Sequence, residues 1–306
     1  MAESQEKPKG PQTTGHVWDG DLQEYNNPLP QWWIYGFYVT ILFALVYWVV
    51  YPSWPVGQGF LTGVNTITYT NSQGQAETWH WNTRAKLLRE MQEAAAQQRP
   101  WFERIAQMPY EQIVKDPELM GFVRSAGRAL FTDNCAGCHQ VGGGGKIGHY
   151  PNLTDDNWIY GGTFDKIRET IVQGRHGYMP PFTEALSRAQ IDALAHYVLS
   201  LAGEPHDAAQ AAEGNTLFHS HTAACYYCHG DDGKGRQDIG SANLTDRIWL
   251  WADVPGAPDL PAKVAQVRQV ILGGLNRGNM PAWEGRLSEE QIKVLTVYVH
   301  QLGGGQ

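Results

Sequence analysis

Two copies of one short pattern, Cys-x-x-Cys-His, constrain this chain more than any other feature. They occupy residues 135–139 and 225–229 and contain all four cysteines of the 306-residue sequence. Two thiols one helical turn apart, followed at once by a histidine, form the attachment signal of a c-type haem. A zinc site or a thioredoxin-like redox pair does not need that histidine, and the redox pair would need a βαβ context. The sequence therefore predicts two covalently bound haem c groups, attached through Cys135, Cys138, Cys225 and Cys228.

The region around these motifs is an internal repeat. Cys135 aligns with Cys225 at an offset of 90, the two Asn-Leu-Thr-Asp runs (152–155 and 243–246) align at 91, and two Met-Pro pairs align at 101. The growing offset places an extra loop within 251–261. In each copy we expect a helix before the motif (121–134 or 213–223), a middle helix (164–173 or 262–272) and a last helix (188–201 or 289–302). This layout resembles the class I cytochrome c fold. It predicts a mainly α protein whose two tandem cytochrome c-like domains cover 121–204 and 208–306.

The repeat also suggests the axial ligands of both irons. His139 and His229 are the expected proximal ligands, while Met179 and Met280 occupy equivalent positions and are each followed by proline. A methionine opposite a histidine raises the reduction potential of the iron, which suits an electron carrier. The alternatives are core methionines that fill gaps and, in the first copy, His176 as the sixth ligand.

Other polar residues near the motifs have simpler expected roles. We expect a backbone carbonyl near Pro151 to orient the His139 ring. Arg175 and Arg277 are candidates for pairing with a haem propionate. Four further histidines are expected to be surface or structural residues: His149, His196, His219 and His221.

One segment is apolar enough to cross a membrane. Residues 32–51 contain no charge, are long enough to span a bilayer as a helix, and carry tryptophan and tyrosine at both ends. We expect a transmembrane helix over 31–52. Lys7 and Lys9 precede it, and no lysine or arginine follows until Arg84, so residues 1–30 are expected in the cytoplasm with little regular structure. The haem domains then lie on the outer, periplasmic side.

Residues 53–120 are predicted to form a linker. Within it, 57–76 reads as a loop or short hairpin, 78–98 as a helix stopped by Pro100, and 101–115 as a further short helix. The net charge of -8 argues against nucleic acid as a partner and agrees with either a basic protein partner or an ordinary soluble surface.

Two runs before the apolar segment carry a resemblance to a known family. The sequence His-Val-Trp-Asp-Gly at 16–20 and Asn-Asn-Pro-Leu-Pro-Gln-Trp-Trp at 26–33 resemble the corresponding segment of subunit III of cbb3-type cytochrome c oxidases. The resemblance implies a dihaem electron-transfer subunit of the bacterial inner membrane. Its implied partners are a soluble periplasmic cytochrome c donor, a membrane-anchored monohaem cytochrome c subunit and a haem–copper catalytic subunit that reduces oxygen and drives proton pumping. The chain itself would be an electron carrier without catalytic residues. The resemblance also implies that Met179 serves the His139 site and Met280 the His229 site.

Other functions remain open at this point. A tethered dihaem cytochrome could serve another periplasmic oxidoreductase, and an assembly subunit could carry haems with a structural role. A dihaem peroxidase would need one iron with an open position, and the two aligned methionines argue against it.

Overall fold

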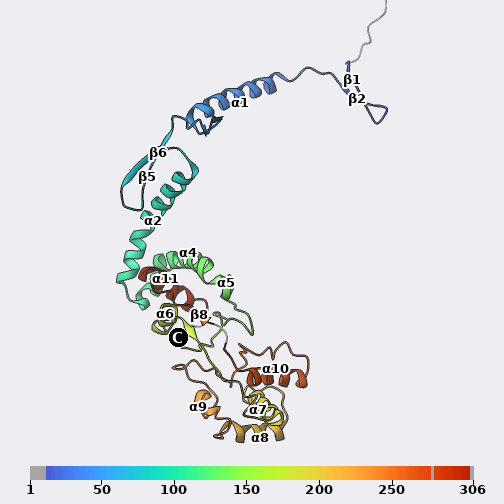
Figure 1. Ribbon diagram of the computed structural model, residues 1–306, viewed down its shortest axis with the longest axis vertical. Helices are drawn as coiled ribbons and strands as arrows, with labels where there is room; N and C mark the ends of the chain where they lie inside the picture. Colours follow the sequence, from blue (N-terminus) through green and yellow to red (C-terminus); the bar gives the residue numbers. More distant parts are fainter. Residues whose placement is uncertain (1–11, 277–278, 304–306) are drawn as a thin grey trace, which may run out of the picture. The chain divides into compact units, whose positions relative to one another are not determined.

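The computed structural model describes residues 12–276 and 279–303. It divides the chain into two compact units, one through Gln97 and one from Gln98 onward (Figure 1). Each unit has its own secondary structure and is described by itself.

The first unit is built around an exposed apolar helix, α1 (Gln31–Val50), which begins after Pro30 and buries none of its residues. Among the described residues it is the one helix that is long and apolar enough to cross a membrane, by length and composition. It has 20 residues, and at 1.5 Å per residue it matches the hydrocarbon thickness of a bilayer. Its position agrees with the predicted span over 31–52.

Hairpins flank this helix on both sides. Strands β1 (Thr13–Trp18) and β2 (Leu22–Tyr25) pair before it, so the expectation of little regular structure over 1–30 is wrong for this stretch. The turn between the two strands has positive φ at Asp19 and Gly20, a conformation that favours hairpins. The prolines that suggested a loop lie outside both strands. After α1 the structure has two hairpins where a loop or one short hairpin was expected over 57–76. Their strands are β3 (Pro55–Val56) with β4 (Gly59–Phe60), and β5 (Thr66–Thr70) with β6 (Ala76–His80).

Helix α2 (Thr83–Gln107) differs from its prediction at both ends. It starts later than residue 78 because residues up to His80 belong to β6, and the Asn82 side chain accepts a hydrogen bond from the Ala85 N–H at the helix start. Pro100 lies inside the helix and does not end it. Proline removes one backbone bond, but Phe102 and Ile105 just beyond it pack in an apolar cluster that stabilises the continuation.

The second unit contains nine further helices among the described residues. They are α3 (Tyr110–Lys115), α4 (Pro117–Asn134), α5 (Ala136–His139), α6 (Phe164–Gln173), α7 (Arg188–Leu201), α8 (Ala208–Phe218), α9 (Tyr226–His229), α10 (Leu260–Gly273) and α11 (Glu289–His300). Ser187 and Ser288 start the two equivalent helices α7 and α11 with the same capping box. The helix predicted over 213–223 starts earlier, because Asp207 caps α8.

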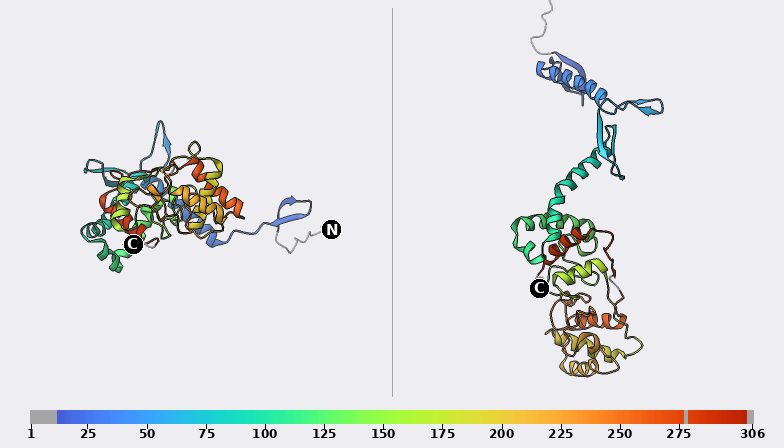
Figure 2. Two further views of the ribbon diagram at one scale, coloured as in Figure 1. Left: turned by 90° about the horizontal axis from the view of Figure 1, so that it is seen from below. Right: turned by 90° about the vertical axis from the view of Figure 1, so that its left-hand side faces the viewer.

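These helices associate across the repeat boundary. A first lobe joins α4, α5 and α6 to the last helix of the chain, α11, while a second lobe joins α8, α9 and α10 to α7 (Figures 1 and 2). The same contact stands at the centre of each lobe. Gly127 of α4 lies against Tyr298 of α11, and Gly214 of α8 lies against Tyr197 and the Ala193 carbonyl of α7, with no room for a side chain at either glycine.

A short two-stranded ribbon joins the lobes. Strand β7 (Arg175–His176) pairs antiparallel with β8 (Asn279–Met280), and Met179 continues the pairing with Leu275. The segments that carry Met179 and Met280 therefore lie side by side. The boundaries 121–204 and 208–306 remain a prediction about the repeat in the sequence, whereas the helical packing in space is crossed.

Candidate haem sites

The first Cys-x-x-Cys-His motif forms a single helical turn directly after α4. Cys135 is half-buried and Cys138 exposed, and the His139 N–H donates to the Cys135 carbonyl at 2.9 Å. The His139 ring is buried, and its Nδ1 lies 3.0 Å from the carbonyl oxygen of Pro151. Because a carbonyl only accepts, Nδ1 carries the proton and Nε2 is left with a lone pair for a metal. The expectation that a carbonyl near Pro151 orients this ring is confirmed.

The second motif repeats this arrangement. Cys225 is half-buried, Cys228 is exposed, and His229 Nδ1 lies 2.9 Å from the carbonyl oxygen of Ala242, the residue that aligns with Pro151. Burial lowers the pKa of both His139 and His229, so each ring is neutral at pH 7. A neutral imidazole with a fixed tautomer is the form that binds a metal.

The methionines cross between the two sites. Met280 packs in the apolar cluster of the first lobe, beside Cys135 and Trp158. Met179 packs in the cluster of the second lobe, and it lines one cavity together with Cys225 and His229. The resemblance implies Met179 with His139 and Met280 with His229, whereas the structure packs each methionine in the lobe that holds the other histidine. This exchange accompanies the β7–β8 pairing, in which the segments that carry the two methionines lie side by side between the lobes.

Two glycines hold this crossing in place. Gly174 ends α6 with a φ of +70°, and a Cβ there would overlap the Met280 carbonyl; Gly274 follows α10 with a φ of +59°, and a Cβ there would overlap the Met179 carbonyl. Only glycine adopts this conformation without strain while allowing another backbone so close. Each lobe therefore packs closely against the methionine segment that belongs, in sequence, to the other repeat copy.

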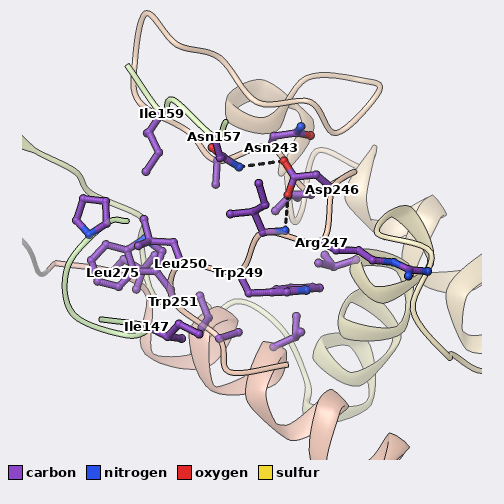
Figure 3. A pocket seen from close by; sticks show the side chains of 18 of the residues that line it. Ile147, Asn157, Ile159, Asn243, Asp246, Arg247, Trp249, Leu250, Trp251 and Leu275 are labelled. Atoms are coloured by element: carbon purple, nitrogen blue, oxygen red, sulfur yellow. Dashed lines mark hydrogen bonds between the residues drawn. The ribbon is translucent and has the colours of Figure 1, made fainter. Parts of the chain in front are cut away.

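The cavity of the second lobe has a volume of about 490 Å³ and is lined mainly by apolar side chains. Figure 3 shows Trp249, Leu250, Trp251 and Leu275 around it, with Asn157, Asn243 and Asp246 along one side. Pockets for organic cofactors fall in this range and have this character. Residues of the loop after the first motif, such as Ile147 and Tyr150, also line it, so the two copies of the repeat build it together.

The first thiol of each motif is un-ionised in this environment. Burial raises the pKa of Cys135 and of Cys225 to about 11. Both thiols therefore keep their protons at neutral pH, and neither has the lowered pKa of a redox-active cysteine. This agrees with thiols that form thioethers and disagrees with a catalytic dithiol.

An unpartnered donor in each lobe fits the propionates of a haem. The indole Nε1 atoms of Trp158 and Trp249 are buried without a hydrogen-bond partner, and the two tryptophans are equivalent at the repeat offset of 91. A buried N–H without an acceptor is costly, so an acceptor at this place is expected. A carboxylate of a bound haem would supply it in both lobes. This pair was not predicted from the sequence, although tryptophan recurs three residues after each Asn-Leu-Thr-Asp run.

The Asn-Leu-Thr-Asp runs themselves form turns beside the sites. Asn152 accepts bonds from the backbone and hydroxyl of Thr154, and Asn243 does the same for Thr245. The two turns meet between the lobes, where the Asn157 side-chain amide donates to Asp246 at 2.9 Å. Burial raises the pKa of the Asp246 carboxyl in this position.

Among the remaining predicted residues that the structure describes, several have protein partners of their own. Arg175 is held by Glu169, at 3.0 Å, and by the ring of Tyr160, so its guanidinium already has protein partners. Arg277 lies outside the described residues. His176 is an exposed residue of β7, while His196 is buried and accepts a bond from the Asp207 N–H, which confirms its structural role.

His219 has a structural place beside the second motif. Its two ring nitrogens lie 2.9 Å and 3.0 Å from the carbonyl oxygens of Asn215 and Asp231. Both nitrogens are therefore donors, which excludes His219 as an iron ligand. His149 and His221 are exposed, His149 with its Nδ1 beside the Ile147 carbonyl.

Comparison with known proteins agrees with these features. The family described as "Cytochrome C oxidase, cbb3-type, subunit III" matches residues 124–198 and 209–299, and "N-terminal domain of cytochrome oxidase-cbb3, FixP" matches residues 10–58. The cbb3-type cytochrome c oxidase subunit FixP of Azorhizobium caulinodans is 43% identical over 97% of this chain and 94% of its own length. The CcoP subunit of Cereibacter sphaeroides is 37% identical over 99% and 98%, and that of Rubrivivax gelatinosus 42% over 95% and 84%.

Fold and sites together define a c-type cytochrome whose helical haem-binding unit follows a helix able to anchor it in a membrane. Within the class of c-type cytochromes, the family matches cover both the N-terminal segment and the haem-binding unit. The chain belongs to the family of subunit III of the cbb3-type cytochrome c oxidases.

Proposed function

We propose that this chain is the dihaem electron-transfer subunit of a cbb3-type oxidase. It takes electrons from a periplasmic cytochrome c and passes them, by way of a monohaem cytochrome subunit, towards the haem–copper subunit that reduces oxygen. The observation that carries the proposal is the duplicated site, in which a neutral histidine fixed by a carbonyl shares its lobe with a methionine of the crossing ribbon.

Each residue of the site has a defined task. Cys135 and Cys138 would hold one haem c, and Cys225 and Cys228 a second. His139 with Met280, and His229 with Met179, would supply the axial ligands. The apolar lining excludes water and the Trp158 and Trp249 N–H groups would donate to propionates. When bound, the haem supplies reversible one-electron chemistry at its iron. With a histidine and a methionine of the chain both holding the iron, oxygen would have no place to bind, and its reduction would belong to the partner.

The proposed topology is a single span in the bacterial inner membrane. The N-terminal segment lies in the cytoplasm and the haem lobes in the periplasm. Lys7 and Lys9 before α1, with no lysine or arginine between Lys9 and Arg84, support this orientation.

The decisive test is a pyridine haemochrome spectrum with copper analysis on the tagged chain, purified in mild detergent from its native membrane. Haem b and copper that co-purify in fixed ratio with haem c support the proposal. Two haems c per chain without haem b or copper would leave a tethered carrier that serves another periplasmic oxidoreductase.

A further inference from the structure

The short hairpin after α1 is fastened to the end of that helix. The Ser53 N–H donates to Leu61 and the Leu61 N–H to Trp54, which closes the hairpin at its base. The returning chain then caps the helix, because the Val64 and Asn65 N–H groups donate to the carbonyls of Val49 and Val50 at 3.1 Å and 3.0 Å. These carbonyls belong to the last turn of α1. The carbonyl groups of a last turn have no N–H donors within their own helix.

The fastening depends on one glycine. Gly63 has a φ of +73°, and any Cβ at this position would overlap the carbonyl of Val50. The edge-to-face contact between Trp48 of α1 and Trp54 at the hairpin base, with ring centroids 4.9 Å apart, adds a side-chain tie. The hairpin is thus a fixed extension of α1, and its two strands project from the helix end in the right-hand view of Figure 2.

The hairpin exposes apolar side chains and carries no charge. Trp54, Val56, Phe60 and Leu61 are each between 47% and 58% exposed. No charged residue or histidine occurs from Tyr25 to Ala76, a stretch that covers β2's last residue, α1, the hairpin and β5. The following hairpin differs, because its strand β6 contains Glu77, which accepts bonds from Tyr69, Asn71 and Trp79.

We propose that the hairpin of residues 54–61 lies flat in the interfacial layer of the bilayer, at the C-terminal end of α1, with lipid as the occupant of its exposed apolar face. The proposal rests on the proposed function only in taking α1 as a membrane anchor. An uncharged surface that continues a membrane span and presents tryptophan and phenylalanine is the composition that favours the headgroup–acyl boundary.

The capping bonds support lipid as the surrounding medium. Backbone groups at the edge of the hydrocarbon have little water to bond to, so a helix that ends there needs internal partners for its last carbonyls. The chain that returns from the hairpin supplies two of them, through the Val64 and Asn65 N–H groups. The position of the hairpin fixes how deeply α1 sits and where the charged part of the chain, from Glu77 onward, starts outside the membrane.

The test is the depth of a fluorescent label on the hairpin in the assembled complex. In the proposed holoprotein the four native cysteines are in thioether bonds, so Val56→Cys adds the chain's one free thiol, and the unmutated complex labelled in parallel corrects for thiols of other subunits. The matched control is Ser72→Cys, which lies at the exposed turn of the β5–β6 hairpin. Both variants are labelled with the fluorophore NBD and reconstituted in nanodiscs that contain lipids spin-labelled near the headgroup or deep in the acyl chain.

We expect the label at position 56 to emit at shorter wavelength than the label at 72 and to lose roughly half of its emission to the shallow spin label, as an interfacial residue should. Iodide in the water should quench the label at 72 instead. Quenching of position 56 by iodide alone would overturn the proposal in favour of a water-exposed hairpin. If neither the lipid spin labels nor iodide quenches the label at position 56, the proposal would be overturned in favour of a hairpin covered by another subunit.

Two features keep the result interpretable. Gln58→Cys at the tip of the same hairpin should report the same depth if Val56→Cys fails to assemble. Haem b and copper are measured on the same preparation, so a chain that is not an oxidase subunit is recognised separately from a hairpin that is not in lipid.

Discussion

At the scale of single residues, the two histidines and two methionines carry different amounts of information. Each histidine follows its cysteines directly, so the covalent chain itself positions it, and its carbonyl partner is local as well. Each methionine lies far from the motifs in sequence, and its site depends on packing. The sequence predicts all four residues as iron ligands, and the structure packs each methionine in the lobe opposite to the one that the resemblance implies.

Replacement of Met280 tests the crossing directly. Met280→Leu should remove the thioether from the first lobe and lower the potential of the haem attached to Cys135, by a value on the order of 100 mV, because methionine ligation raises the potential. Met179→Leu should do the same to the haem attached to Cys225. Redox titrations of both variants, each repeated in a background with Cys225 and Cys228 changed to serine, assign the affected haem. If Met280→Leu leaves the haem at Cys135 unchanged, the crossed assignment is wrong.

His219 should stabilise the fold in a pH-dependent manner. Hydrogen bonds to the backbone carbonyls of Asn215 and Asp231 raise the pKa of its ring. A group whose pKa is higher in the folded state stabilises fully below its unfolded value, about 6.5, and loses this effect as pH rises through the folded value. The free energy lost in His219→Gln should therefore be larger near pH 5.5 than near pH 9.

Urea unfolding followed by circular dichroism at both pH values measures the difference, with exposed His221→Gln as the control. An equal loss at both pH values would show that protonation of His219 has no part in its contribution.

At the scale of elements, the helices with strong end signals were predicted well. The predicted ranges 164–173 and 188–201 match α6 and α7, because Thr163 and Ser187 cap their starts and Gly174 ends the first of them. The predictions failed where local signals were outweighed by contacts. Pro100 does not end α2, since apolar packing beyond it stabilises the continuation, and the β1–β2 hairpin has few signals apart from its Asp-Gly turn.

Gly174 gives a test of the ribbon as an element. In Gly174→Ala the new Cβ would meet the Met280 carbonyl at a positive φ, so we expect a loss of about 1–3 kcal/mol in unfolding free energy and a disturbed haem at Cys135. Gly273→Ala is the matched control, because Gly273 ends α10 and has no atom near its Cβ position. Thermal unfolding and the near-infrared absorption of the iron–sulfur bond report the two effects. A disturbance at the Cys225 haem instead would contradict the crossed packing.

At the scale of the whole second unit, the sequence could not have predicted which last helix each lobe receives. Helices α7 and α11 carry several identical apolar or aromatic residues at equivalent positions, with Leu194 and Tyr197 matching Leu295 and Tyr298. Either helix therefore fits either partner by composition and periodicity. The short connection from Leu201 to Ala208 favours α7 against α8 as an antiparallel pair, which leaves α11 to complete the first lobe.

The equivalent leucines of these two helices distinguish crossed from sequential packing. Leu194 and Leu295 are each 1% exposed, and truncation of either to alanine should cost about 2–5 kcal/mol. In the crossed fold, Leu295→Ala loosens the first lobe and Leu194→Ala the second, because the cavity opens against the helices that each leucine contacts. Hydrogen exchange read by mass spectrometry should therefore show faster exchange in α4 and α6 for Leu295→Ala, and in α8 and α10 for Leu194→Ala. Sequential domains would give the reverse pattern. Both variants make the same chemical change at a residue of the same burial, so each is the control for the other. If the variant in a helix of one repeat copy speeds exchange around the haem site of the other copy, the two sites form one structural unit.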